Sequence, residues 1–170
     1  MLDQTTAYDQ REFRIAVNSA AVLGWCYAAT PIVLDGKPEL LVFAAPVGLP
    51  LAFIACWLIA APILRRIMKR PISWVRAGLW GGVIAAAIEL FGVAISRYRG
   101  WRHSLDDSFN YQMGGGDSVR NIDGILTPYG WWVQVQTSAG WILAGIAIAL
   151  LLRAVIGPGR NVREVQETFS

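Results

Sequence analysis

The chain alternates long apolar stretches with short polar ones. Four apolar stretches hold about 20 or more residues each, the length that a helix needs to cross the roughly 30 Å hydrocarbon core of a bilayer. They cover Ile15–Leu34, Leu40–Leu64, Trp74–Ser96 and Trp132–Leu152. The pattern therefore predicts an all-α membrane protein, built as a bundle of four transmembrane helices.

The same stretches divide the chain into five segments. We expect an N-terminal segment over 1–14, three helices within 15–97, an ordered outer loop over 98–131, a fourth helix over 132–153 and a tail over 154–170. The loop is too long for a simple connector and carries aromatic residues along its length, so we expect it to be folded. Within it, Asp123-Gly124 is a typical two-residue turn, which predicts a short hairpin.

Basic residues gather in segments that would share one side of the membrane. Arg11 and Arg14 precede the first apolar stretch, Arg65 and Arg66 follow the second, and Arg153 ends the fourth. Because basic residues in short loops favour the cytoplasmic side, both termini are expected in the cytoplasm and the long loop in the periplasm. This placement accounts for the net charge of +3 without a nucleic-acid partner.

The composition also points to a host and a membrane. Charged residues make up 16% of the chain, against about 25% in soluble domains. Thirteen of the 15 basic residues are arginine, and alanine is abundant. Such a bias is typical of GC-rich bacterial genomes, so we expect a bacterial inner membrane.

Each apolar stretch carries small residues three or four positions apart. Residues at this spacing share one helix face, and small side chains let helices approach closely in lipid. Some such rows also arise by chance in a chain rich in alanine and glycine. We expect the helices to pack through these faces, and the glycines of the rows include Gly24, Gly48, Gly78, Gly82 and Gly140.

One carboxylate, Glu89, interrupts the apolar stretch "GGVIAAAIELFGVAISR". It lies on the small-residue face, so it is expected to face a neighbouring helix rather than lipid. Gln136, Ser138 and Tyr27 lie at a similar depth and complete a predicted polar site. Glu89 is interpreted either as a neutral, hydrogen-bonded lock between helices or as a titrating site for a proton or cation. An ion pair with a partner protein or with an arginine of the outer loop is a third interpretation.

The outer loop holds the other residues with a candidate role. His103 is the single histidine, which excludes metal sites built from several histidines. A Ser-His-Asp arrangement needs a geometry that the sequence does not give, and phosphate-binding glycine loops and C-x-x-C motifs are absent. We expect no metal or cofactor and favour a role in interaction over catalysis. The expected interaction residues are Trp101, Arg102, His103, Asp106, Asp107, Tyr129 and Trp131.

The sequence leaves two main functions open. The favoured one is an accessory or assembly subunit of a larger membrane complex, joined through small-residue faces and the aromatic outer loop. The alternative is a homo-oligomeric channel, transporter or membrane sensor in which Glu89 titrates. An enzyme using Glu89, His103 or Asp107 is least favoured. The expected partners are the bilayer and other membrane subunits or further copies of this chain.

Overall fold

The computed structural model describes residues 7–106 and 110–159, and four of its helices are long and apolar enough to cross a membrane. These helices confirm the prediction of four helices that are long and apolar enough to span a membrane. The first, third and fourth spans are α1, α4 and α5. Their bounds are Gln10–Leu34, Trp74–His103 and Pro128–Ile156.

Side-chain caps fix where three of the helices begin. Asp9 Oδ1 accepts a hydrogen bond from Glu12 N at 2.7 Å, and Glu12 Oε2 accepts one from Asp9 N at 2.8 Å, which forms a capping box before α1. Ser73 caps α4, and Thr127 caps α5 by accepting from Gly130 N at 3.0 Å. These contacts satisfy amides that the first helical turn leaves without a partner.

The helices extend beyond the apolar stretches that predicted them, and two of these extensions shorten the outer loop. α4 continues past Ser96 to His103, and α5 starts at Pro128 rather than at Trp132. Hydropathy marks where lipid contact would end, whereas the helix continues for as long as its backbone hydrogen bonds do. The connection between these helices is therefore shorter than the predicted loop.

The second span is the irregular one. It begins with the short 3-10 helix η1 (Pro38–Leu40), continues as α2 (Leu41–Ala55), passes through the π-helix η2 (Cys56–Ala60) and ends as α3 (Ala61–Ile67). α2 contains Pro46 and Pro50, and each removes a backbone donor from the helix. The π-helix adds a residue to the local turn.

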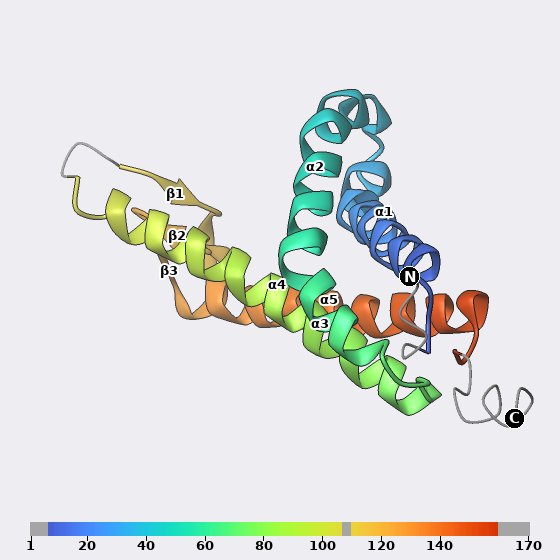
Figure 1. The fold of residues 1–170 in the computed structure, drawn as a ribbon. Coiled ribbons are helices and arrows are strands. Elements are labelled where there is room, and N and C mark those ends of the chain that lie inside the picture. The colour runs from blue at the N-terminus through green and yellow to red at the C-terminus, as the bar shows by residue number, and fades with distance from the viewer. Residues whose placement is uncertain (1–6, 107–109, 160–170) are drawn as a thin grey trace, which may run out of the picture.

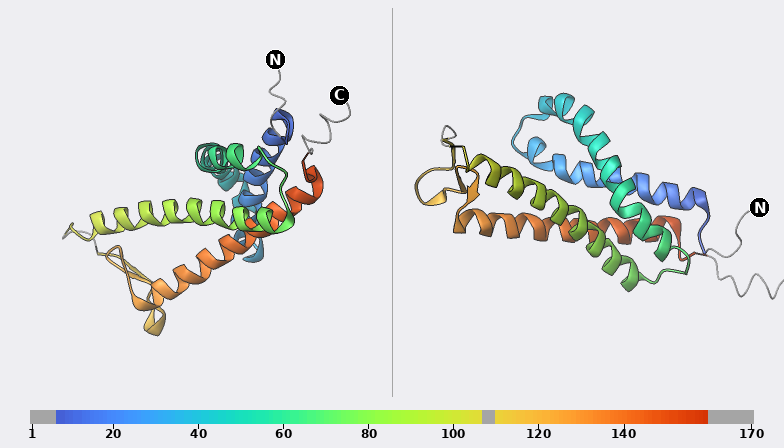
Figure 2. Two further views of the ribbon diagram at one scale, coloured as in Figure 1. Left: turned by 60° about the horizontal axis from the view of Figure 1, so that its bottom comes forward. Right: turned by 60° about the vertical axis from the view of Figure 1, so that its left-hand side comes forward.

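The four spans form two pairs, α1 with the second span and α4 with α5. α4 and α5 make the most extensive contact, and α1 packs on both α2 and α5. Figure 1 shows the α1–α2 hairpin crossing the α4–α5 pair near the chain termini, a region here called the terminal end. Figure 2 shows the other half of the pair extending past the hairpin, with α4 and α5 moving apart. Residues 89–103 of α4 and 128–140 of α5 are here called the arm.

A small antiparallel sheet joins the outer ends of α4 and α5 (Figure 2). Its strands are β1 (Gln112–Met113), β2 (Asn121–Ile122) and β3 (Ile125–Leu126), in the order β1-β2-β3, and a 3-10 turn, η3 (Gly116–Ser118), precedes β2. The turn between β2 and β3 is Asp123-Gly124, with φ of 49° and 89°, as a two-residue hairpin requires. This sheet is here called the meander, and its side of the molecule the meander end.

Glycines let the meander contact both helices through the backbone. The carbonyl oxygen of Gly124 lies too close to Gly100 of α4 to leave room for a Cβ there, and the carbonyl oxygen of Gly100 blocks Gly124 in the same way. In α5, a Cβ on Gly130 would meet the carbonyl oxygen of Arg120. The meander is therefore held against α4 and α5 at positions that tolerate no larger side chain.

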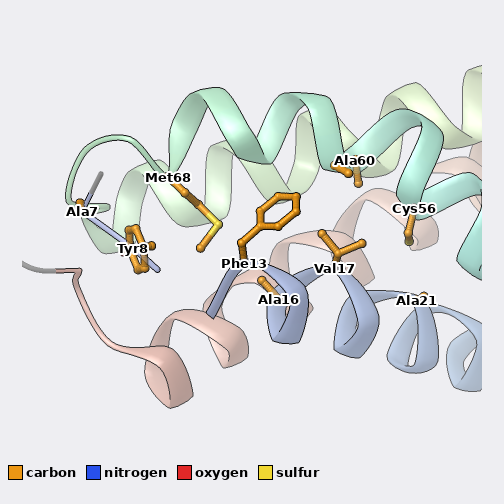
Figure 3. Close-up of a cluster of buried hydrophobic side chains, with 10 residues drawn as sticks. Ala7, Tyr8, Phe13, Ala16, Val17, Ala21, Cys56, Ala60 and Met68 are labelled. Atoms are coloured by element: carbon orange, nitrogen blue, oxygen red, sulfur yellow. The ribbon is translucent and has the colours of Figure 1, made fainter. Parts of the chain in front are cut away.

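The buried core lies at the terminal end, between α1 and the second half of the second span. Figure 3 shows Phe13 and Val17 of α1 pointing toward Ala60 and Met68. The Phe13 and Trp57 rings meet edge to face with centroids 6.0 Å apart, and the Arg65 guanidinium lies 5.4 Å from the Phe13 centroid. This cluster holds the hairpin together near the chain termini rather than at its tip.

Candidate functional site

Glu89 lies between α4 and α5 and bonds to two side chains of α5. Its Oε1 accepts hydrogen bonds from Ser138 Oγ at 2.9 Å and from Gln134 Nε2 at 3.1 Å. Gln134 Nε2 also lies 3.4 Å from Ser138 Oγ. Gln134 and Ser138 are four residues apart, so they share one face of α5. These three residues form the polar cluster.

Two residues that we expected in the polar site, Gln136 and Tyr27, lie outside this cluster. Gln136 is exposed and makes no hydrogen bond to another described residue, because a shift of two positions from Gln134 turns it to the far side of α5. Gln134 occupies the place that we expected Gln136 to take. Tyr27 packs edge to face on Trp141 at 5.0 Å and lies against Gly140, without a hydrogen bond to Glu89.

The polar cluster is only partly covered by protein. Glu89, Gln134 and Ser138 are all half-buried, and each of their hydrogen bonds joins α4 to α5 or stays within α5. Glu89 lies about 12 Å along α4 from Arg97, at 1.5 Å per residue. The second carboxyl oxygen, Oε2, has no hydrogen-bond partner among the described residues. Oε2 can therefore accept a hydrogen bond from a donor outside the chain.

The closest approach of α4 and α5 uses glycines that the sequence analysis did not select. A Cβ on Gly81 would lie 2.5 Å from Gly145 O and would also meet the Ala149 side chain. A Cβ on Gly145 would lie 2.8 Å from Gly81 O and would meet Ala85. The sequence does contain a motif for this close contact, in the two small-x-x-x-small pairs Gly81 with Ala85 and Gly145 with Ala149.

The five glycines that were predicted to pack the helices together have different neighbours. Cβ atoms on Gly78 and Gly82 would meet Ile146 at 3.6 and 3.2 Å, and one on Gly140 would lie 2.6 Å from the Tyr27 hydroxyl. One on Gly48 would lie 2.5 Å from Trp25 Nε1. Gly24 differs, since a Cβ there would meet nothing within 4 Å. Four of the five positions therefore contact another helix, and Gly24 faces open space.

That open space is a cavity of about 450 Å³ between the spans. Its wall consists mainly of alanine, glycine and isoleucine from all four spans, so part of the predicted small-residue faces surrounds a gap instead of closing it. Arg153 is the single charged residue in its described lining, at the terminal end. Tyr8 lies at the same end and donates from its hydroxyl to Gly157 O at 3.3 Å. Burial raises the pKa of the Tyr8 phenol above its ordinary value, so this donor stays protonated.

The predicted interaction residues of the outer loop fall into two places. Trp101, Arg102, His103 and Asp106 line one shallow pocket where α4 ends. Tyr129 and Trp131 lie on the first turn of α5, both exposed. Asp107 lies outside the described residues. Over residues 7–106 and 110–159, no three of the His, Cys, Asp and Glu side chains are placed to hold a metal ion.

Arg97 of α4 has an unusual environment that the sequence did not reveal. Its Nη2 donates to Ser96 Oγ at 3.0 Å, while Nε and Nη1 are buried without a partner among the described residues. Asn121 Oδ1 of β2 is also buried without a hydrogen-bond partner among the described residues. Buried donors of this kind are costly. Arg97 makes no ion pair with Glu89, since the carboxyl group bonds to α5 instead.

Comparison with known proteins adds no relative to this description. No family model, no curated protein and no solved structure is significantly similar to the chain.

Proposed function

We propose that this chain is an accessory subunit of a larger membrane complex and that it joins its partner through the arm. The observation that carries the proposal is the half-buried Glu89 carboxyl group, set in the apolar length of a two-helix arm. Ionisable groups at membrane depth face protein or water, because lipid leaves them unsolvated. α5 covers one side of Glu89, and a second subunit covers the other.

Two further features of the arm support a protein partner. Gln136 is exposed on α5 with no hydrogen bond to a described residue, and an amide in lipid gains from a partner across the interface. On α4, Gly92 continues the face of Ala85 and Ile88, is exposed, and has nothing within 4 Å of where a Cβ would lie. A partner helix can approach the arm closely at Gly92.

The location that goes with this function is a bacterial inner membrane with both termini in the cytoplasm. The terminal end carries Arg65, Arg66, Lys69 and Arg70 between the second and third spans, and Arg153 at the end of the fourth. Such a concentration of basic residues favours the cytoplasmic side.

The proposal is tested by native mass spectrometry of the protein extracted mildly from its own membrane. We expect a stoichiometric complex with other chains. Gly92→Leu fills the open face of the arm and is expected to remove this complex, because the partner helix can no longer approach. Ala94→Leu makes a similar change on an exposed position two residues away and serves as the control.

Two results would count against an accessory subunit. One is co-purification of the Gly92→Leu protein with its partner at the wild-type yield. The other is a closed assembly that contains this chain alone. Retained helix content, measured by circular dichroism, separates loss of the partner from loss of the fold.

The second candidate is a homo-oligomeric channel, transporter or sensor, and the unpaired Oε2 of Glu89 is the observation that favours it. Copies of the chain meeting at the arm would surround a group able to bind a proton or a cation. This candidate predicts a pH-dependent flux or response in reconstituted vesicles that Glu89→Gln abolishes. In an accessory subunit the same substitution changes assembly little, since the amide oxygen still accepts from Gln134 and Ser138.

A further inference from the structure

The cavity between the spans extends along the helices and is here called the groove. Its lining runs from Tyr8 and Arg153 at the terminal end to Ile32, Ile88 and Trp141. Between Trp141 and Arg153, α5 rises about 18 Å at 1.5 Å per residue. This length is close to the depth of one leaflet, about 15 Å or half of the hydrocarbon core.

The lining of the groove selects what fits inside. Its volume of about 450 Å³ lies within the range of about 300–1,000 Å³ that is typical of ligand sites. Its described wall holds one charged residue, Arg153, so the rest of its length suits an apolar chain.

Arg153 gives the groove a charged end. Its Nε donates to Ile72 O at 2.6 Å, and its guanidinium lies 5.1 Å from the centroid of the Trp74 ring. No described carboxylate pairs with it, and its two Nη groups make no hydrogen bond within residues 7–106 and 110–159. The planar fork of an arginine matches a phosphate group with two parallel hydrogen bonds.

The surroundings of Arg153 place it at the level of lipid head groups. It lies in the last turn of α5, next to Trp74 in the first turn of α4, and tryptophan is enriched where a membrane meets water. Basic pockets between transmembrane helices bind anionic head groups. The charged end and the apolar groove thus match the two parts of one amphiphile.

We propose that the groove binds one acyl chain of an anionic membrane phospholipid, whose phosphate pairs with Arg153. The lipid completes the interior of the protein, because its chain fills the space that the small side chains leave open. This site is separate from the arm, so it stands whether or not the chain is an accessory subunit.

The experiment places the delipidated full chain in nanodiscs that contain equal amounts of phosphatidylglycerol and phosphatidylcholine. Native mass spectrometry after release then counts the retained lipids. We expect one phosphatidylglycerol per wild-type chain and little phosphatidylcholine, because the choline cation offsets the phosphate charge that Arg153 attracts. The lipid that co-purifies from the native membrane is identified in parallel and is expected to carry an anionic head group and acyl chains.

Matched variants test the two parts of the site separately. Ala144→Leu and Gly24→Leu narrow the groove and are expected to lower retention about fivefold or more. Ala147→Leu, exposed on the same helix as Ala144 and outside the groove, leaves retention unchanged. Arg153→Gln lowers phosphatidylglycerol retention about fivefold, whereas Arg76→Gln, on an exposed arginine near the same end, does not.

Several results would overturn the proposal. They are equal retention in the Ala144→Leu and Ala147→Leu proteins, equal retention of the two lipids by the wild type, or a native ligand without an anionic head group or without acyl chains. A prenyl phosphate as the native ligand belongs to the last of these. If the groove variants fail to fold, the comparison of Arg153→Gln with Arg76→Gln still decides the outcome.

Discussion

At the scale of single residues, the hydrogen bonds of Glu89 determine how α4 and α5 align. Both bonds reach the same oxygen, from Gln134 and Ser138 one turn apart on α5. A slide of either helix by one turn would leave at most one of the two donors beside Glu89, so the polar cluster favours one register of the pair. In membrane proteins such bonds average about 0.6 kcal/mol and reach about 1.7 kcal/mol.

A comparison of two glutamines tests this role. Gln134→Leu removes a donor from Glu89 and is expected to lower the free energy of unfolding by about 0.6–1.7 kcal/mol. Gln136→Leu, two residues away and without a hydrogen bond to a described residue, is expected to leave the stability of the isolated chain unchanged. Denaturant titration in micelles measures both, and an equal loss in the two variants would contradict the structure.

Why the sequence pointed to Gln136 rather than Gln134 has a physical explanation. Composition places a glutamine near the depth of Glu89, but the rotation of α5 about its axis decides which glutamine faces α4. That rotation depends on the contact of Gly81 with Gly145, which involves residues far apart in sequence. Glu89 and Ser138 could be predicted as members of the polar site, because their depth and their positions along the helices are enough to place them there.

At the scale of elements, the crossing of α4 and α5 depends on the absence of side chains. Gly81 and Gly145 bring the two backbones together, with Ala85 and Ala149 on either side. Toward the meander the helices separate (Figure 2), and the polar cluster lies between them. The two helices of the arm are thus held together at one end by the contact of Gly81 with Gly145 and at the other end by the meander.

Two alanine substitutions measure the strength of the crossing. Gly81→Ala places a Cβ 2.5 Å from Gly145 O and is expected to lower the unfolding free energy by about 1–3 kcal/mol, as overpacked sites do. Gly78→Ala places its Cβ 3.6 Å from Ile146, an ordinary contact, and gains up to about 1 kcal/mol of helix propensity. Thermal unfolding in one detergent compares them, and the reverse order would rule out this crossing.

The elements themselves were largely predictable, whereas their contacts were not. Long apolar stretches and the turn residues Asp123-Gly124 act locally, so four helices and the hairpin could be expected from the sequence. The groove could not, because rows of small residues allow either close packing or a gap. Gly24 and Gly48 belong to similar rows, yet a Cβ on Gly48 would meet Trp25, whereas one on Gly24 would meet nothing within 4 Å.

At the scale of the whole molecule, the two ends differ in chemistry. The terminal end holds the buried core, the basic loop after α3 and the charged end of the groove. The meander end holds the sheet, the arm and the exposed aromatic residues Trp101, Tyr129 and Trp131. In the proposed orientation, the lipid site belongs to the cytoplasmic leaflet and the partner site to the opposite half of the membrane.

Cysteine labelling tests this orientation in intact cells. In a background where Cys26 and Cys56 are replaced by alanine, Gly115→Cys is expected to react with a membrane-impermeant maleimide added outside. Lys69→Cys is expected to react only after the cells are opened, because the proposed orientation places its loop in the cytoplasm. Labelling in the opposite pattern would invert the topology.

The irregular second span has a mechanical consequence for the groove that it lines. Pro46 and Pro50 each remove a backbone hydrogen bond, and the π-helix Cys56–Ala60 loosens the turn that follows. A rod weakened at three successive points bends under a smaller load than α4, which has no proline inside it. Lateral pressure from the bilayer, or a thicker hydrocarbon chain, would therefore deform this wall first. The hydrogen bonds of Glu89, held between the two stiffer rods, would keep their lengths while the groove widens and narrows beside them.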